Sequence, residues 1–160
     1  MVKPIEAVTF RSKFGSLRLA VSGKSLVSAA FIRRSEGSSK IKNALLKKCL
    51  KELREYFEGR RPAFTLKLDP RGTRFEKRVW QALRQIPAGR MVSYKEVASW
   101  IGRKKAVRAV AGAIGRNPLP ILIPCHRVIG SDGRLMGYAY GLSKKARLLK
   151  HERRWASIGP

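Results

Sequence analysis

A segment rich in glycine and proline, residues 59–73, separates two stretches of this 160-residue chain. Before the segment, three short apolar runs resemble strands, and a helical pattern follows them. After it, apolar residues recur every three or four positions, as in helices. Glycine and proline interrupt regular elements, because glycine is conformationally permissive and proline lacks an N–H group. We therefore predict two small domains, over 1–68 and 75–160, with 69–74 as the linker.

The first half predicts an antiparallel meander and one helix. Turn residues around Gly15 and Gly23 separate three strand-like runs, over 5–10, 16–22 and 25–32. A helical pattern then begins at Ser38-Ser39 and ends at Gly59, with Cys49 on its apolar stripe. We interpret Cys49 as a small core thiol. The predicted fold class is α/β of the α+β type, with this small sheet and helix joined to a mostly helical domain.

The second half contains the outline of a helix-turn-helix at about 93–115. Ser93 precedes Glu96 by three residues, which is the spacing of a capping box, and Gly102 is placed to end that helix. A second short helix is predicted within 104–115, after a tight turn. Two short helices joined in this way are typical of DNA-binding modules.

Several prolines interrupt the second half of the chain. Pro87 is expected to end a helix over 74–86. Further along, Pro118, Pro120 and Pro124 are expected to hold the chain extended up to Cys125.

Charge is the strongest feature of the composition. Lys and Arg number 36 against 10 Asp and Glu, a formal net charge of +26. Such a chain is expected to bind a polyanion, with nucleic acid as the first candidate and an acidic membrane surface as the second. The second helix of the predicted module is rich in small residues, which would let its backbone approach a groove, and Arg108 is its one long central side chain. Small residues also permit close helix packing, but the net charge favours DNA.

Several classes of protein are not expected. No apolar run approaches the roughly 18 residues that span a bilayer, and the first ten residues lack the apolar core of a signal peptide. We therefore expect a cytoplasmic protein with no membrane partner. The chain has two cysteines and two histidines and neither a CxxC nor an HExxH motif, so we expect free thiols, no metal and no cofactor.

The residues Cys125, His126 and Arg127 carry the most chemical information. A nucleophilic thiolate needs a base or a positive charge nearby, and both follow directly in the sequence. The pair alone also fits a buried cysteine beside a surface histidine, because successive side chains of a strand point to opposite faces.

The longer string IPCHRVI, with Asn117 eight residues before the cysteine and LLKHE at 148–152, resembles the active site of the O6-alkylguanine-DNA alkyltransferases. The resemblance continues through VSYKEVASWIG and RAVAGAIGRNP and covers about 75–153. The first 70 residues match more loosely, in their outline and in YFEG at 56–59. The resemblance implies a prokaryotic, monomeric suicide repair protein. It would flip an O6-alkylguanine out of double-stranded DNA and move the alkyl group irreversibly to its own cysteine.

The resemblance also implies a role for each matching residue. Cys125 would accept the alkyl group, His126 would deprotonate it through a water, and Glu152 would orient and charge-balance the histidine. Tyr94 would protonate or hydrogen-bond the leaving guanine, and Asn117 would brace the turn before the cysteine. Lys145 matches a lysine near the pocket. Arg108 would fill the space that the flipped nucleotide leaves.

The remaining residues of the implied site surround the base or the DNA. The backbone near Cys125, Val128 and Ala139 would read the guanine, and Leu135 and Tyr138 would form pocket walls. Tyr140 stands where a small residue is common and is expected to narrow the pocket. Residues expected at the DNA are Ala106, Ala109, Arg103, Lys104, Lys105, Arg116 and Arg134.

Two other functions fit parts of the pattern. One is a helix-turn-helix protein that binds alkylated bases without chemistry, but relatives of that kind lack the acceptor cysteine. The other is a thiol hydrolase, but the sequence offers no evident substrate cleft apart from the DNA face and no step with an activated water that would regenerate the thiol.

Overall fold

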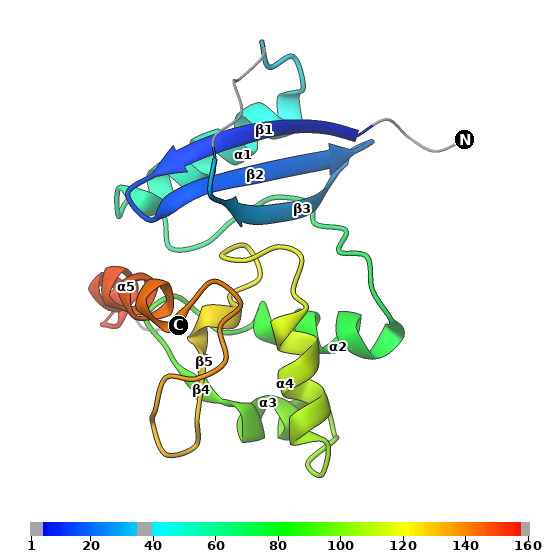
Figure 1. The fold of residues 1–160 in the computed structure, drawn as a ribbon, viewed down its shortest axis with the longest axis vertical. Coiled ribbons are helices and arrows are strands. Elements are labelled where there is room, and N and C mark those ends of the chain that lie inside the picture. Colours follow the sequence, from blue (N-terminus) through cyan, green and yellow to red (C-terminus); the bar gives the residue numbers. More distant parts are fainter. Residues whose placement is uncertain (1–4, 35–39, 158–160) are drawn as a thin grey trace. The chain divides into compact units, whose positions relative to one another are not determined.

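The computed structural model describes residues 5–34 and 40–157. The chain divides into two compact units, residues 1–71 and 72–160 (Figure 1). None of the described helices is long and apolar enough to cross a membrane.

The first unit is built on a three-stranded antiparallel sheet. Its strands are β1 (Ile5–Ser12), β2 (Gly15–Ser22) and β3 (Ser25–Ile32), in the order β1-β2-β3. Leu19 on the central strand pairs with Val8 on one side and Ala29 on the other, and all three side chains are buried. The predicted meander is therefore confirmed, with β1 two residues longer than expected.

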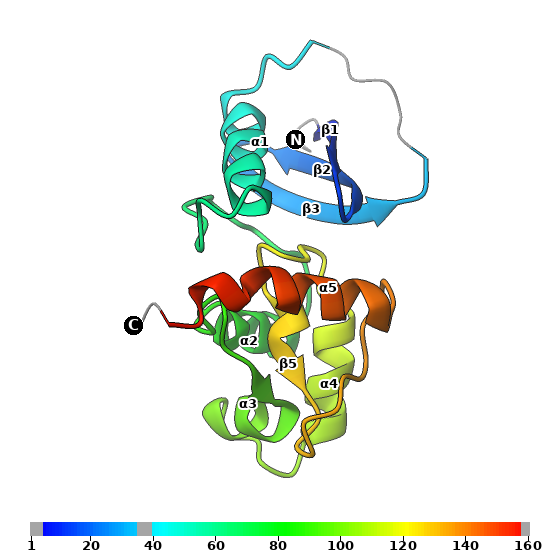
Figure 2. The same cartoon turned by 90° about the vertical axis from the view of Figure 1, so that its left-hand side faces the viewer.

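Helix α1 (Ala44–Phe57) lies against one face of this sheet (Figures 1 and 2). Its stop at Gly59, which has a positive φ of 79°, agrees with the prediction. Its start does not, because the Asn43 side chain accepts hydrogen bonds from the N–H groups of Leu45 and Leu46 and so caps the helix there. The predicted start at Ser38-Ser39 lies outside the described residues.

Aromatic rings and one thiol fill the space between α1 and the sheet. Phe57 stacks on Phe10 and Phe14 at ring-centroid distances of 5.8 and 5.2 Å. Cys49 is fully buried, and burial raises the pKa of its thiol to about 12. The prediction of a core thiol is confirmed.

The second unit is mainly helical. Its elements are α2 (Arg74–Leu83), β4 (Val92–Ser93), α3 (Tyr94–Trp100), α4 (Val107–Gly115), the 3-10 turn η1 (Cys125–Arg127), β5 (Val128–Ile129), α5 (Leu142–Glu152) and the 3-10 turn η2 (Arg153–Trp155). Helix α2 ends three residues before the predicted limit of 86. The capping box of Ser93 and Glu96 and the positive φ of Gly102 are both present, so α3 is bounded as predicted. The fold class is confirmed: an antiparallel sheet with a helix, followed by a helical domain.

A parallel pairing of β4 with β5 positions the two halves of the site. Val92 pairs with Val128, and Ser93 pairs with Ile129. This two-residue ladder fixes the start of α3, where Tyr94 lies, next to the segment that follows Cys125. Figure 2 shows β5 in the middle of the unit, near α4 and α5.

The segment before Cys125 is not extended, which corrects the expectation from its prolines. The Ile123 N–H donates to the Leu119 carbonyl at 2.8 Å, and Ile121 has a positive φ of 73°. The Asn117 side chain joins both ends of this turn: it donates to the Ile123 carbonyl at 2.8 Å and accepts from the Leu119 N–H at 2.9 Å. Proline fixes its own φ but leaves its ψ open, so these side-chain bonds decide the fold of the segment. Cys125 consequently begins a 3-10 turn instead of ending a strand.

Candidate active site at Cys125

Cys125 lies at the first position of η1, and only 6% of its surface is exposed. Burial raises the pKa of its thiol. A hydrogen bond with the Asn117 side chain and the positive charge of Lys145 act in the opposite direction, because both favour the thiolate. The same asparagine that shapes the preceding turn therefore also acts to lower the pKa of the thiol.

His126 and Arg127 both contact Glu152, which ends α5. The His126 Nε2 atom is 2.9 Å from Glu152 Oε1. Arg127 donates two hydrogen bonds to the same carboxylate, from Nε at 2.9 Å and from Nη2 at 2.7 Å, and a third to the Ile86 carbonyl at 2.5 Å. The His126 and Glu152 side chains are fully buried, so this is an ion-pair network without solvent screening.

The charge on Glu152 determines which nitrogen of His126 can act as a base. Burial alone would raise the pKa of Glu152, but His126 and Arg127 beside it hold that pKa well below its usual range. An ionised carboxylate only accepts hydrogen bonds, so His126 Nε2 carries a hydrogen, and in the neutral imidazole Nδ1 is then the nitrogen with the lone pair. Nδ1 is buried and has no hydrogen-bond partner among the described residues.

Arg127 is the site residue whose contact the sequence did not reveal. The sequence indicates only a positive charge near Cys125. In the structure the guanidinium of Arg127 donates to the carboxylate of Glu152, 25 residues further along the chain. Its place in the PCHRV string was the available signal.

Lys145 of α5 connects two loops of the site. It is fully buried, and its Nζ donates to the carbonyls of Val128 and Met136 at 2.5 and 2.6 Å. Burial lowers the pKa of Lys145 to about 8, while the nearby Cys125 acts to raise it. The lysine thus brings a positive charge close to the thiol and attaches the 130–141 loop to β5.

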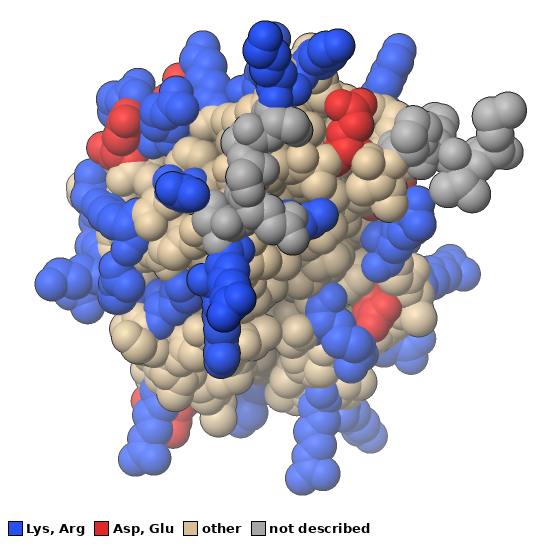
Figure 3. Space-filling model, turned by 45° about the horizontal axis from the view of Figure 1, so that its top comes forward, with Lys and Arg blue, Asp and Glu red and all other residues tan. Residues whose placement is uncertain are grey.

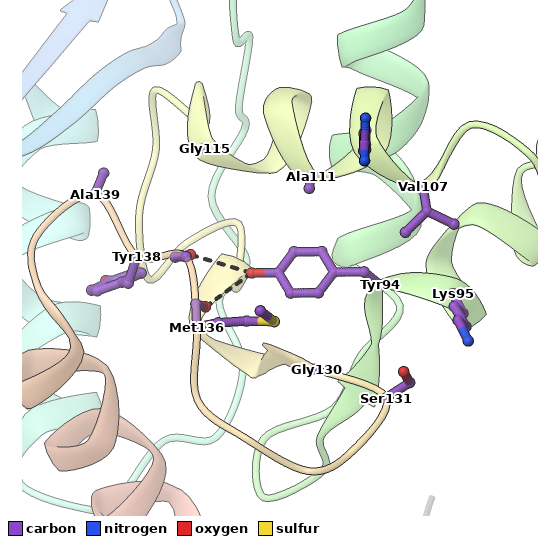
Figure 4. Close-up of a pocket in the computed structure, with 12 residues that line it drawn as sticks. Tyr94, Lys95, Val107, Ala111, Gly115, Gly130, Ser131, Met136, Tyr138 and Ala139 are labelled. Atoms are coloured by element: carbon purple, nitrogen blue, oxygen red, sulfur yellow. Dashed lines mark hydrogen bonds between the residues drawn. The ribbon is translucent and has the colours of Figure 1, made fainter.

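Tyr94 points across a hollow toward the same loop (Figure 4). Its hydroxyl lies 3.0 Å from the Met136 carbonyl and 3.3 Å from the Gly137 carbonyl. Burial, and to a smaller degree the nearby Cys125, raise the pKa of Tyr94. Gly137 has a φ of 60°, and a Cβ atom there would lie 2.8 Å from the tyrosine oxygen, so the close approach requires glycine.

Two hollows of different size share Gly115 and residues 137–139 in their linings. The larger has a volume of about 580 Å³ and is lined by residues that include Tyr94, Val107, Arg108, Ala111, Met136, Tyr138 and Ala139. The smaller, of about 10 Å³, is lined by Ile114, Gly115, Asn117, Cys125, Gly137, Tyr138, Ala139 and Tyr140.

Of the predicted pocket residues, Tyr94, Tyr138, Ala139 and Tyr140 line these hollows, whereas Val128 and Leu135 do not. Tyr138 and Ala139 line both, while Tyr140 lines only the small one, with its ring 5.8 Å from that of Tyr138. Leu135 lines neither hollow, and its neighbour Met136 lines the larger one. The loop is irregular, so the alternation of a strand could not identify which neighbour faces inward.

The residues predicted at the DNA lie on α4 and on the turns next to it, except Arg134, which lies in the 130–141 loop. Arg108 and Ala109 are exposed on α4, Ala106 directly precedes it, and Arg103, Lys104 and Lys105 are exposed in the α3–α4 turn. Two others have acidic partners: Arg116 binds Glu76 at 2.5 Å, and Arg134 lies 3.6 Å from Asp132. Figure 3 shows Lys and Arg side chains spread over one face of the molecule, with few acidic residues among them.

The fold and the site together define a class of protein: a helical module that has two short helices joined by a tight turn and a buried thiol beside a His–Glu–Arg network. Comparison with known families agrees. Residues 74–154 match the DNA-binding domain of 6-O-methylguanine DNA methyltransferase, and residues 7–70 match the ribonuclease-like domain of the same family. The chain belongs to this family.

Individual relatives support the assignment. A methylated-DNA–protein-cysteine methyltransferase of Methanosarcina acetivorans is 42% identical over 151 residues, which cover 89% of this chain and 95% of that one. A namesake from Methanosarcina barkeri is 56% identical, but the match spans 65% of its length. The Escherichia coli bifunctional transcriptional activator/DNA repair enzyme Ada is 59% identical over 88 residues, a quarter of its length. This chain falls in the class methylated-DNA–protein-cysteine methyltransferase.

Solved structures show the same fold. The O6-methylguanine methyltransferase of Mycobacterium tuberculosis superposes with a TM-score of 0.86 at 36% identity, covering 98% of this chain and 97% of that one. A structure of Mycobacterium tuberculosis OGT in complex with DNA gives a TM-score of 0.83 at 39% identity and covers 94% of each chain.

Proposed function

We propose that this protein repairs DNA by moving an alkyl group, mainly methyl, from the O6 atom of guanine to the sulfur of Cys125. The observation that carries the proposal is the buried Cys125 thiol, whose pKa Asn117 and Lys145 act to lower and whose neighbour His126 belongs to the His126–Glu152–Arg127 network. A buried thiol needs such support, because burial alone disfavours the nucleophilic thiolate.

The first step is the deprotonation of Cys125. The proton leaves the sulfur and reaches His126 Nδ1 through a water, and the electron pair stays on the sulfur. Glu152 then stabilises the imidazolium through the Nε2–H bond, and Arg127 keeps the carboxylate ionised and in place. Asn117 and Lys145 stabilise the thiolate by a hydrogen bond and a positive charge.

In the second step the thiolate attacks the alkyl carbon. The new S–C bond forms as the C–O6 bond breaks, and the bonding electrons leave with the purine. Tyr94 donates a proton or a hydrogen bond to the departing guanine, so its hydroxyl must exchange the Met136 carbonyl for the base. A thioether has no simple route back to the thiolate, so each molecule acts once.

The guanine must leave the duplex to reach Cys125. We infer that α4 approaches a groove through its small residues Ala106 and Ala109, and that Arg108, which lines the larger hollow, fills the space left by the flipped nucleotide. Arg103, Lys104 and Lys105 are candidates for phosphate contacts. Arg116 and Arg134 are weaker candidates, because each would first have to leave an acidic partner. The partner is double-stranded DNA, and we propose that the protein acts as a monomer in the cytoplasm.

The experiment that tests this function follows the methyl group. The protein is incubated with duplex DNA that contains O6-(deuteromethyl)guanine, and tryptic peptides are mapped by mass spectrometry. The label is expected on Cys125, and a Cys49→Ala variant is expected to accept it equally well. Label on Cys49, or methylation of Cys125→Ser, would contradict the assignment.

A further inference from the structure

The hydroxyl of Tyr138 is a buried donor without an acceptor. Its oxygen has no hydrogen-bond partner among the described residues. Burial, with smaller contributions from the nearby Cys125, Tyr140 and Glu152, raises the pKa of this phenol, so the hydroxyl keeps its proton. Buried polar groups are nearly always paired, and one left unpaired destabilises a fold. We therefore expect the Tyr138 hydroxyl to donate its hydrogen bond in another state of the protein, in which an acceptor is present.

Cys125 is the group near Tyr138 that becomes a stronger hydrogen-bond acceptor during the reaction. Both residues line the small hollow of about 10 Å³, together with Asn117 and Tyr140. A thiol is a weak acceptor, whereas a thiolate is an anion and a strong one. When the sulfur loses its proton, an acceptor appears in the cavity that Tyr138 lines.

The orientation of the side chain agrees with this role. Figure 4 shows the Tyr138 ring pointing away from the Tyr94 ring. The hydroxyl is thus separated from the tyrosine assigned to the leaving guanine.

We propose that the Tyr138 hydroxyl donates a hydrogen bond to the Cys125 thiolate as it forms, which makes Tyr138 a catalytic residue and more than a pocket wall. The phenol keeps its proton throughout, and the proton of the thiol still goes to His126. The donor is unpaired before the reaction and paired during it, so the interaction favours the charged state selectively. This inference rests on Cys125 being the nucleophile of the proposed function.

The test uses the full chain with the Cys49→Ala substitution, so that Cys125 is the one remaining thiol. The rate of alkylation by iodoacetamide is measured from pH 5 to 10 without DNA, for this protein and for its Tyr138→Phe and Tyr140→Phe derivatives. Tyr140→Phe is the matched control, because its ring lines the same hollow. For Tyr138→Phe we expect the midpoint to rise by about one pH unit or more, with a roughly tenfold or greater loss of rate at pH 7. Tyr140→Phe should leave the midpoint nearly unchanged.

A stability measurement separates this role from a structural one. Removing an unpaired buried hydroxyl should leave Tyr138→Phe as stable as its parent or more stable. A midpoint that does not move, an equal shift in both derivatives, or a loss of stability in Tyr138→Phe would overturn the proposal. Because iodoacetamide needs no DNA, these outcomes are independent of whether the protein accepts methyl groups from guanine.

Discussion

The Arg127→Met variant removes the cation that supports Glu152 and leaves a side chain of similar length. In the wild-type protein the fully buried carboxylate accepts two hydrogen bonds from Arg127 and contacts His126. Without Arg127 it would keep only the contact with His126, and the Ile86 carbonyl would lose its donor.

The expected loss of stability follows from the burial of the Arg127–Glu152 ion pair. Removing one partner of a buried ion pair typically costs about 3–5 kcal/mol, because the remaining charge is left uncompensated in a medium of low dielectric. We expect a loss of this size in the free energy of unfolding of Arg127→Met. Arg127→Lys keeps the charge but not the two-pronged geometry, so its loss should be intermediate.

Arg116→Met provides a matched control within the same unit. Arg116 also binds a glutamate, Glu76, but its side chain is 62% exposed, and exposed pairs contribute little. Urea denaturation at pH 7, followed by circular dichroism, measures all three variants. If Arg127→Met and Arg116→Met lose similar amounts of stability, the view of Arg127 as the support of Glu152 is wrong.

Three further predictions concern DNA, the leaving group and pH. Arg108→Ala should slow repair in duplex DNA more than reaction with free O6-methylguanine, whereas Tyr94→Phe should slow both; equal duplex-to-base ratios in single-turnover assays would contradict this division of roles. Affinity for undamaged duplex should fall with salt, with a slope of log affinity against log salt of about −0.9 per phosphate contacted, while methyl transfer at saturating DNA should change little. A flat binding slope would assign the basic surface to another partner. The pKa of Lys145 is lowered from 10.5 to about 8, so between these values the unfolded chain binds more protons. Folding stability relative to Lys145→Met should therefore rise with pH in this range, and a fall would contradict the burial of the charge.

Sequence patterns of a few residues predicted the strands and helix ends whose formation depends on neighbouring residues. The strand-like runs within residues 5–32, the capping box at Ser93 and the glycine stops at 59 and 102 each depend on neighbouring residues, and the structure contains all of them. The start of α1 was misplaced because several polar residues precede it, and the choice of Asn43 depends on its two backbone contacts.

Long-range contacts could not be predicted from the residues alone. The β4–β5 pairing joins two-residue strands 36 positions apart, too short for a periodic signal. The turn before Cys125 depends on side-chain bonds of Asn117, which outweigh the extended preference of the prolines. His126 and Glu152 were paired through a family resemblance, whereas the contact of Arg127 with the same carboxylate appeared only in the fold.

Intact-mass spectrometry with excess substrate tests the central proposal most directly. The protein is mixed with a tenfold molar excess of duplex DNA containing O6-methylguanine, and the protein mass and the remaining lesions are followed over time. We predict that each protein molecule gains one methyl group on Cys125, that one lesion disappears per molecule, and that the reaction then stops. Continued loss of lesions beyond one per protein, or repair without a change in protein mass, would contradict the account.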